Sequence, residues 1–386
     1  MSERPVLVET PESVSAMARA LEGAERLYLD TEFESNRSGI RICLLQATDG
    51  KQVFLVDALK ARDLSPLRGP FETSEWVVHA GLQDVDLIRQ AIGASSPRSL
   101  FDTQVGWALS TAESNVSLAY LKFLMLGVRE DKAHQADDWT RRPLSEDQLR
   151  YAASDILHLP ALFEALEKRA EALSPSRPEM IRLASREATE RLTSLPHRLT
   201  LESFRNAWQL GPAAQNGLRF LIEWFNGLSR EEREDAPEPK ALFAIASRMP
   251  HSRDVLLQLK GVPRGFALRH HKRIIEGLAD AARTANMRDF VAIAPPPYAT
   301  FEDIRLDAWL ALLRAEVCAE LRVSPEFVLP ARVTKNMREL LAELRGVPVD
   351  RPDALTAALA PALEGFRKAL LLEKIQAFCE KEPPPL

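Results

Sequence analysis

The stretch LYLDTEFES, residues 27–35, sets two carboxylates, Asp30 and Glu32, into a run that otherwise has the composition of a buried strand. Because side chains alternate along a strand, Asp30 and Glu32 project to the same face, and Leu27, Leu29, Thr31 and Phe33 project to the other. Two neighbouring acids repel each other, and a buried charge is costly unless it is paired or binds metal. The stretch therefore predicts a sheet with a cation held between these two acids.

Length and composition limit the classes of protein to consider. The chain has 386 residues, 46% of them hydrophobic, which indicates two or three globular domains. No apolar run is long enough to span a bilayer, and the first ten residues, MSERPVLVET, lack a signal-peptide core. The three cysteines, Cys43, Cys318 and Cys379, match no zinc spacing and are expected to be free thiols. We therefore expect a cytoplasmic protein with no membrane partner.

Charge is unevenly distributed along the chain. The net charge of -5 divides into -7 for residues 1–170 and +2 for residues 171–386. The acidic part would repel a polyanion unless its acids are masked by divalent metal. The basic run RHHKR, Arg269 to Arg273, could bind a polyanion in the second part.

The hydrophobic pattern also changes along the chain. Up to about residue 110, strand-like runs alternate with helical ones, which is typical of an α/β domain with a mixed sheet; these runs are RLYLDTEF, IRICLLQAT, QVFLVDA and EWVVHAG. Beyond residue 111 the spacing is helical, including one long helix that begins at Ser145 and ends before SPSRPEM. Two helical blocks follow, joined by the Pro-rich stretch AIAPPPYAT, residues 292–300.

Three more residues extend the acidic motif. Asp84 lies in VVHAGLQDVDLI, where a strand turns into a helix, and Tyr151 and Asp155 lie one helical turn apart in YAASDILHL. Taken singly, Asp84 could be an ordinary helix-start residue, and the Tyr–Asp pair could be a surface hydrogen bond. Taken together, four carboxylates form an all-oxygen site suited to two Mg²⁺ or Mn²⁺ ions, which can clamp a phosphodiester.

These motifs resemble those of a known family. DTEF, HAGLQD and YAASD are similar to the three exonuclease motifs of the DEDDy 3′→5′ exonucleases, and ribonuclease D is the closer match within them. FDTQVGWAL (101–109), DDWTRRPLSEDQLRYAASDILHLP (137–160) and RNAWQL (205–210) look like segments of that family. The two helical blocks resemble HRDC domains, the helicase-and-ribonuclease-D C-terminal modules, and the second block is the looser match.

The resemblance implies a fold class and domain boundaries. The expected fold is a ribonuclease-H-like α/β exonuclease domain with a mixed sheet, followed by two all-α HRDC-like domains. The expected segments are the exonuclease domain over 1–175, a helical linker over 176–205, the first HRDC domain over 206–290, a Pro-rich linker over 291–301 and the second HRDC-like domain over 302–380.

The resemblance also implies a role for each site residue. Asp30 would bridge two divalent cations, Glu32 and Asp155 would complete the nucleophile-side ion, and Asp84 would hold the second ion, partly through water. Tyr151 would position the attacking water. The residues expected to contact substrate are Phe33, His79, Thr103, Trp139 and Arg142. For His79 a local hydrogen bond at the strand end is an equal alternative, and for Trp139 packing under the Tyr151 helix is another.

The implied activity is that of a 3′→5′ exoribonuclease, acting as a monomer. Its expected substrates are RNAs with a single-stranded 3′ end, tRNA precursors among them, and its products are 5′-monophosphates. One alternative is a DNA exonuclease of the Werner type, but the chain carries the HRDC-like tail without the phosphate loop of a helicase motor. The other is a catalytically silent RNA-binding protein, which the retention of all four acids and Tyr151 disfavours.

The sequence departs from the family pattern after DTEF. The family has an aromatic-rich stretch with a Pro there, whereas this chain has ESNRSGIRICLLQ, with neither Tyr nor Pro. HAGLQD carries Gln83 where an acid is common. The first departure bears on substrate preference and leaves the predicted metal ligands intact.

Overall fold

The structure is a computed structural model that describes residues 4–36, 39–129, 137–193, 198–229, 232–233, 236–285, 291–295, 298–344 and 352–385. Its contacts divide the chain into two compact units. The first unit comprises Met1–Thr193 together with Thr300–Leu386, and the second comprises Ser194–Ala299. The contacts thus group the second helical block with the sheet, while the domain boundaries expected from the sequence stay predictions.

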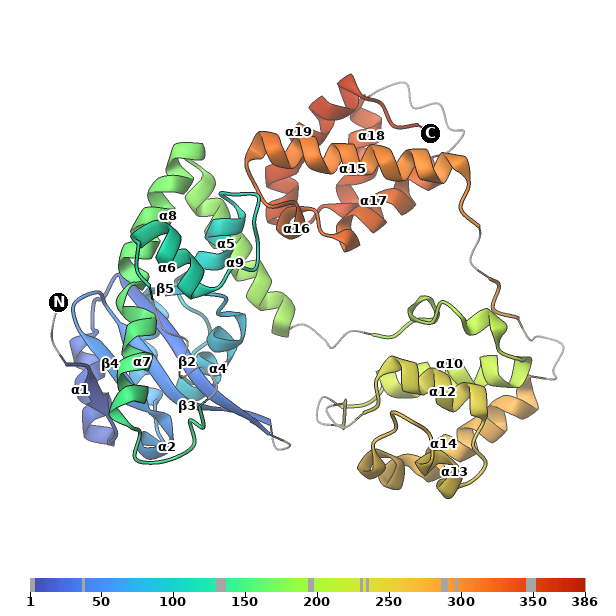
Figure 1. Ribbon diagram of the computed structural model, residues 1–386, viewed down its shortest axis with the longest axis horizontal. Helices are drawn as coiled ribbons and strands as arrows, with labels where there is room; N and C mark the ends of the chain where they lie inside the picture. Colours follow the sequence, from blue (N-terminus) through green and yellow to red (C-terminus); the bar gives the residue numbers. More distant parts are fainter. Residues whose placement is uncertain are drawn as a thin grey trace. The chain divides into compact units, whose positions relative to one another are not determined.

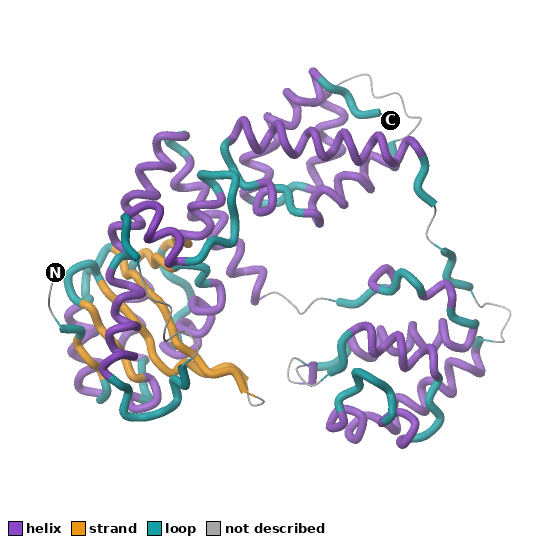
Figure 2. Tube along the Cα trace, viewed as in Figure 1, coloured by secondary structure: helices purple, strands orange, loops and turns teal. Residues whose placement is uncertain are grey.

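A six-stranded mixed sheet lies in the first unit (Figure 2). Its strands are β1 (Val6–Val8), β2 (Arg26–Asn36), β3 (Gly39–Thr48), β4 (Val53–Asp57), β5 (Glu75–Val78) and β6 (Ser99–Asp102). The spatial order is β1-β4-β3-β2-β5-β6. Strands β2, β3 and β4 form an antiparallel meander, β1 is parallel to β4, and β5 and β6 continue the sheet parallel to β2. The mixed sheet expected from the sequence is confirmed, with β1 and β6 as additions.

Helices cover both faces of this sheet. Those of the first unit are α1 (Pro11–Ala20), α2 (Ala58–Ala61), α3 (Arg68–Thr73), α4 (Leu82–Ile92), α5 (Thr103–Ala108), α6 (Leu118–Leu126), α7 (Glu146–Leu157), α8 (Leu159–Leu173), α9 (Arg177–Thr193), α15 (Phe301–Leu321), α16 (Pro325–Val328), α17 (Ala331–Glu343), α18 (Pro352–Leu359) and α19 (Phe366–Lys381). Single 3₁₀ turns occupy Ser65–Leu67 and Ala360–Ala362. Helices α1, α3 and α4 share one hydrophobic core with one face of the sheet, and α5 to α9 share another core with the opposite face.

Helix α7 runs across the second face, over β2, β3 and β4 (Figure 1). The sequence predicted that one helix continues from Ser145 to residue 173, and this is wrong. The helix ends at Leu157, and α8 begins at Leu159 with Pro160 in its first turn. Proline has no N–H to bond the preceding turn and clashes with the carbonyl four residues back, so Pro160 starts a new helix instead of continuing the old one.

Helix α9 joins the sheet to the C-terminal helices. Ser185 on α9 accepts a hydrogen bond from the backbone N–H of Asp102 at 3.0 Å. Buried Arg177 donates to the carbonyls of Leu109 at 2.7 Å and Leu321 at 3.2 Å. Further along α9, the Glu187 carboxylate accepts from the N–H of Phe366 at 2.8 Å. The segment 176–205, expected to be a helical linker, therefore contains α9, which packs within the first unit.

All regular secondary structure among the described residues of the second unit is helical. It contains α10 (Pro212–Asn226), α12 (Pro239–Arg248), α13 (Arg253–Leu257) and α14 (Arg264–Thr284), with 3₁₀ turns at Leu201–Ser203 and Ala207–Gln209. Its own core is built around Trp224 and Phe266, whose ring centroids are 5.4 Å apart. The mostly helical C-terminal region expected from the sequence is confirmed.

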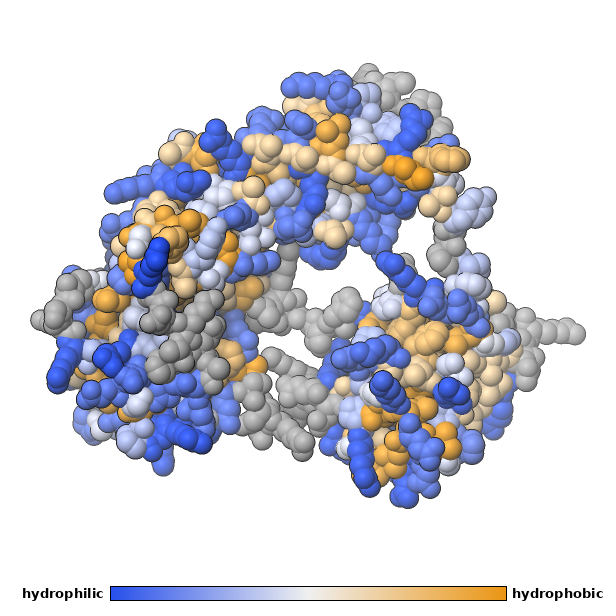
Figure 3. Space-filling view, viewed as in Figure 1, coloured by the Kyte–Doolittle hydropathy of each residue, from blue (hydrophilic) through white to orange (hydrophobic). Residues whose placement is uncertain are grey.

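The surface and the cysteines agree with the composition. Figure 3 shows hydrophilic side chains interspersed with smaller apolar areas on the visible face of each part. Among the described helices, none is both long and apolar enough to cross a membrane. Cys43, Cys318 and Cys379 are buried free thiols, as expected.

Candidate active site

Strand β2 presents Asp30 and Glu32 from the face that carries Tyr28, beneath α7. Tyr28 belongs to the core on that face, whereas Leu27 and Leu29 belong to the core on the other. In the register with β3, Asp30 is paired with Gln46, and Glu32 is paired with Leu44. The pairing shifts between Glu32 and Phe33. The ladder is therefore interrupted directly after the second acid, as in a β-bulge.

Asp84 is positioned by the tight turn between β5 and α4. Ala80 in this turn has a φ of 51°, and a Cβ on Gly81 would lie 2.6 Å from Cβ of Val78. Glycine is therefore required for the close approach of the backbone at this point. The turn places Asp84 in the first turn of α4, where the hydroxyl of Thr31 donates a hydrogen bond to its carboxylate.

Asp102 holds this turn in place, and the sequence reasoning missed it. Its carboxylate accepts hydrogen bonds from the backbone N–H groups of Ala80 at 3.0 Å and Gly81 at 3.1 Å. It also caps α5 by accepting from the N–H of Gln104 at 2.8 Å. An Asp directly before a helix is a recognisable N-cap signal, but its long-range contacts could not be inferred from the local pattern.

Helix α7 presents Tyr151 and Asp155. Ser145 caps the helix, and a reciprocal bond between Ser145 and Gln148 completes a capping box. Ala152 and Ile156 are buried in the core that α7 shares with the sheet. The charges of Asp30 and Glu32 act on the Tyr151 hydroxyl, and the charge of Asp155 acts on both of these acids. The helix therefore brings its Tyr–Asp pair to the two acids of β2.

The four carboxylates lie within electrostatic reach of one another. Burial raises the pKa of Asp30 well above its ordinary value, and the charges of Asp84, Asp155 and Glu32 raise it further. Burial likewise raises the pKa of Glu32 to about 8, with added contributions from Asp155 and Asp84. The pKa of Asp84 is also raised, chiefly by burial. Three separate chain segments thus concentrate negative charge in one place.

Tyr151 belongs to the same electrostatic group. Burial raises the pKa of its hydroxyl, and so do the charges of Asp155, Glu32 and Asp30. The hydroxyl therefore keeps its proton at neutral pH. On the other side, the Tyr151 ring lies against Trp139, with centroids 6.1 Å apart and planes inclined by 36°.

We expect the metal-free protein to lose stability as the pH rises. Unfolded Glu32 releases its proton near pH 4.5, while folded Glu32 holds it until about pH 8. Between these values the folded state binds more protons, so the free energy of unfolding falls with increasing pH. When Tm is measured in the presence of a chelator, it should decrease as the pH is raised from about 5 to about 9.

The matched control for this pH dependence is Glu32→Gln, which removes the titrating group. Its Tm should decline less over the same pH range than that of the wild type. Parallel curves for the two proteins would contradict the assignment of the raised pKa to Glu32.

Lys122 is a second functional candidate that the sequence reasoning missed. Its side chain is fully buried on α6, and Nζ donates to the carbonyl of Ser154 at 2.9 Å. Nζ also lies 3.8 Å from the Asp155 carboxylate. The available signal was a lone lysine within the apolar run LAYLKFLML, since a charge in such a run is buried only where it has a partner.

The donor set suits a hard divalent cation. Carboxylate oxygens are the preferred ligands of Mg²⁺ and Mn²⁺, and the crowding of four acids would be relieved by positive charge between them. As the side chains are placed, no three His, Cys, Asp or Glu residues in the described part of the chain converge closely enough to hold an ion. The carboxylate ligands therefore fit a divalent cation in their chemistry. Their side chains would have to move closer together to hold the ion.

Among the expected substrate residues, Phe33 lies within β2, and His79 and Thr103 directly follow β5 and β6. Phe33 is 37% exposed and is free to meet a ligand. His79 has both ring nitrogens engaged, with Nδ1 2.9 Å from the Thr103 hydroxyl and Nε2 3.0 Å from the Val116 carbonyl. Thr103 is fully buried, and its hydroxyl donates to the Val78 carbonyl at 3.1 Å. The local alternative therefore accounts for His79, and the burial of Thr103 leaves it no surface for a substrate.

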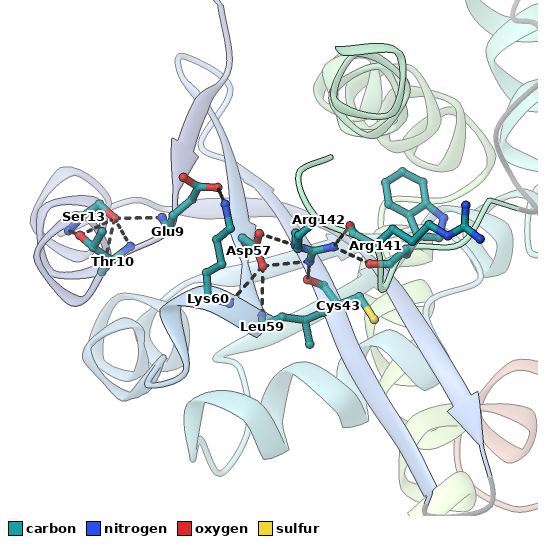
Figure 4. A network of polar contacts seen from close by, with 10 residues as sticks. Glu9, Thr10, Ser13, Cys43, Asp57, Leu59, Lys60, Arg141 and Arg142 are labelled. Atoms are coloured by element: carbon teal, nitrogen blue, oxygen red, sulfur yellow. Dashed lines mark hydrogen bonds and ion pairs between the residues drawn. The ribbon is translucent and has the colours of Figure 1, made fainter. Parts of the chain in front are cut away.

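Trp139 and Arg142 make structural contacts next to the site. Trp139 is 5% exposed and packs against Tyr151, although its indole N–H has no partner among the described residues. The Arg142 guanidinium bonds both carboxylate oxygens of buried Asp57, at 2.5 and 2.8 Å (Figure 4). It also donates to the carbonyls of Trp139 at 2.7 Å and Cys43 at 3.0 Å. These contacts make Arg142 a brace between β3, β4 and the Trp139 segment.

Replacing Arg142 with Ala should destabilise the protein strongly. The change would leave the Asp57 carboxylate, which is 1% exposed, without its ion pair. Loss of one member of a buried pair lowers the free energy of unfolding by about 3–5 kcal/mol. Denaturant unfolding of the full chain, wild type and variant, measures this effect.

Arg141→Ala is the control for the Arg142 variant. Arg141 is exposed and pairs with the exposed Asp138 at 3.1 Å. Its loss should change the free energy of unfolding by less than about 1 kcal/mol. Equal effects of the two substitutions would show that Arg142 is not a structural brace.

Comparisons with known proteins agree with this geometry. Residues 5–171 match the model of a family described as 3′-5′ exonuclease. The chain is 29% identical over 344 residues to ribonuclease D of Gluconacetobacter diazotrophicus, covering 84% of each chain. It is 28% identical over 286 residues to ribonuclease D of Escherichia coli, covering 72% of this chain and 75% of that one.

A solved structure shows the same fold over almost the whole length. The crystal structure of Escherichia coli RNase D superimposes with a TM-score of 0.73 at 23% identity, covering 99% of this chain and 100% of that one. The mixed sheet and the helical C-terminal region therefore share the fold of that structure. Residues 5–171 therefore match a 3′-5′ exonuclease domain, and over most of its length the chain is similar to ribonuclease D in sequence and in fold.

Proposed function

We propose that this chain removes nucleotides from the 3′ end of RNA by hydrolysis at a site that holds two divalent cations, Mg²⁺ or Mn²⁺. Asp30, Glu32, Asp84 and Asp155 are the proposed ligands. The observation that carries the proposal is that the charges of Asp84 on α4 and Asp155 on α7 add to burial in raising the pKa of both Asp30 and Glu32 on β2, so acids from three elements meet at a single place. Exonucleases of this family generally depend on divalent metal.

The bound cations would stabilise the charge on the attacking and leaving oxygens of the phosphodiester. The chain's own residues supply orientation. Asp30 would contact both ions, Glu32 and Asp155 would contact the ion on the side of the attacking water, and Asp84 would contact the other. Because the Tyr151 hydroxyl stays protonated, it orients the attacking water by hydrogen bonding and does not remove a proton from it.

The proposed substrates are RNAs with a single-stranded 3′ end, tRNA precursors among them, and the products are 5′-monophosphates. Phe33 offers an exposed ring at the end of the acidic motif on which a base could stack. In the second unit, α14 exposes Arg269, Lys272 and Arg273, which could bind RNA phosphates. All five catalytic candidates come from one chain, which supports action as a monomer.

A direct assay tests this proposal. The purified chain is incubated with 3′-extended tRNA and, separately, with single-stranded DNA, with Mg²⁺ or with excess chelator. We expect stepwise release of 5′-monophosphates from the RNA with Mg²⁺, and none with chelator. Undiminished hydrolysis in excess chelator would exclude the metal-dependent site.

The same assay separates the two alternatives. Faster degradation of the DNA than of the RNA would indicate a Werner-type DNA exonuclease. Binding of the tRNA without any hydrolysis, at every metal concentration, would indicate an RNA-binding protein that has lost its activity.

A further inference from the structure

Gln46 is a buried polar residue near the C-terminal end of β3 that the proposed mechanism does not use. Its side chain is fully buried. Within the described part of the chain, neither its amide nitrogen Nε2 nor its amide oxygen Oε1 has a hydrogen-bond partner. The other residues of β3 around it, Leu44, Leu45 and Ala47, are buried and apolar.

An unsatisfied amide at this position opposes folding. Buried polar groups are almost always hydrogen-bonded, because burial removes the bonds that they make with water. An apolar side chain of similar shape would fill the same space without that penalty. The contribution of Gln46 to the stability of the sheet therefore does not explain why a glutamine occupies this position, and a functional role would explain it.

The position of Gln46 suggests that role. It is the residue paired with Asp30 in the register of β2 and β3, and paired residues of adjacent strands project to the same face. Cβ atoms of such pairs are about 4.5–5.5 Å apart, so a glutamine amide can reach the opposite carboxylate. Helix α7, which carries Tyr151 and Asp155, packs over both strands.

We propose that Gln46 is a positioning residue whose amide N–H hydrogen-bonds the Asp30 carboxylate when Asp30 binds a divalent cation. This inference rests on the proposed function. The bond would fix the orientation of Asp30 and leave its remaining lone pairs for the cation.

The chemistry of an amide suits this position better than that of other polar side chains. A lysine or arginine opposite Asp30 would compete with the cation for the carboxylate. A glutamate would add another negative charge to four that already repel one another. A neutral donor orients Asp30 without either effect.

Gln46→Met tests the proposal, because methionine keeps the length and linear shape of glutamine and loses both polar atoms. The metal-free variant should melt at the same temperature as the wild type or higher, since an unsatisfied amide is removed. With RNA, kcat should fall about 10- to 100-fold at unchanged KM, the range for a hydrogen bond to a charged group. The Mg²⁺ concentration for half-maximal rate should rise, and the increase in Tm on adding MnCl₂ should shrink.

The chain offers a matched control in Gln215. This glutamine is 4% exposed, its Nε2 donates to the Leu210 carbonyl at 2.9 Å, and its Oε1 accepts from the N–H of Ile293 at 2.7 Å. Gln215→Met should therefore lower Tm, because it removes bonds that are made. It should leave kcat on short RNA oligonucleotides and the Mg²⁺ requirement unchanged.

Two results would overturn the role of Gln46. One is a Gln46→Met variant with wild-type kcat and Mg²⁺ requirement, which would mean that the amide only holds a buried water. The other is a variant that melts lower, as Gln215→Met should, with a loss of rate that matches its loss of folded protein. Asp30→Asn is measured alongside. An active Asp30→Asn variant would contradict the proposed function itself. If Asp30→Asn is inactive and Gln46→Met is normal, only the proposed role of Gln46 is contradicted.

Discussion

Asp30→Asn should lower kcat about a thousand-fold or more while the protein stays folded. Asparagine keeps the shape of aspartate but loses the charge that a cation binds. Asp30 is the acid on which the charges of Asp84, Asp155 and Glu32 all act, and it is the one proposed to contact both ions. A variant that keeps a tenth of the activity would have lost only about 1.4 kcal/mol of transition-state stabilisation, too little for such a ligand.

Two controls accompany this variant: its own Tm, and the kcat of a variant in which a nearby acid is replaced. Burying Asp30 beside other acids costs folding free energy in the metal-free protein, so removing its ionisable group should raise the Tm, and lost activity cannot be attributed to unfolding. Glu34→Gln, on the same strand, removes an acid that pairs with exposed Arg41 at 2.9 Å. Its kcat should stay within about two-fold of the wild type. An equal loss in both variants would contradict a special role for Asp30.

Tyr151→Phe should lower kcat by about 100-fold, because it removes the oxygen that orients the attacking water and keeps the ring. The ring would still pack against Trp139, so Tm should barely change. Metal affinity should also persist, because Asp155 is intact. Single-turnover rates on a short RNA oligonucleotide, with Mg²⁺ saturating, measure the effect on chemistry.

Tyr120→Phe is the control for the loss of a tyrosine hydroxyl. Tyr120 is 41% exposed on α6, and its hydroxyl lies 3.5 Å from the Glu113 carboxylate. Its rate should match that of the wild type. A Tyr151→Phe variant with a normal rate would reduce Tyr151 to a packing residue and leave orientation of the water to the carboxylates.

The sheet could be predicted from the sequence wherever its strands are marked by long runs. Strands β2 to β5 coincide with the four runs that the sequence identifies, because buried β-branched and aromatic residues recur in each. Strands β1 and β6 were missed, since three or four residues are too few to show a strand period. Their pairing with β4 and β5 is decided by contacts far away in the sequence.

The acids of the site could be predicted because each lies in a short local motif. The residues that hold these motifs in place could not, because their partners are far away in the sequence. Arg142 was expected to contact substrate, yet its partner Asp57 lies 85 residues away. Gln46 was missed for the same reason, because only the strand register reveals that it pairs with Asp30. Lys122 and Asp102 likewise act through residues on other elements. Local patterns therefore identify the groups proposed to do the chemistry, and the folded structure identifies the groups that hold them.

Asp30, Glu32, Asp84 and Asp155 are proposed above all as ligands of divalent cations. Anomalous diffraction at the manganese edge, from crystals of the protein grown with MnCl₂, would locate such cations in the folded protein. We expect two manganese peaks in bonding contact with the Asp30 carboxylate, one also in contact with Glu32 and Asp155 and the other near Asp84. Crystals that show no manganese at Asp30 under saturating MnCl₂, or manganese only at other surface acids, would contradict this proposal.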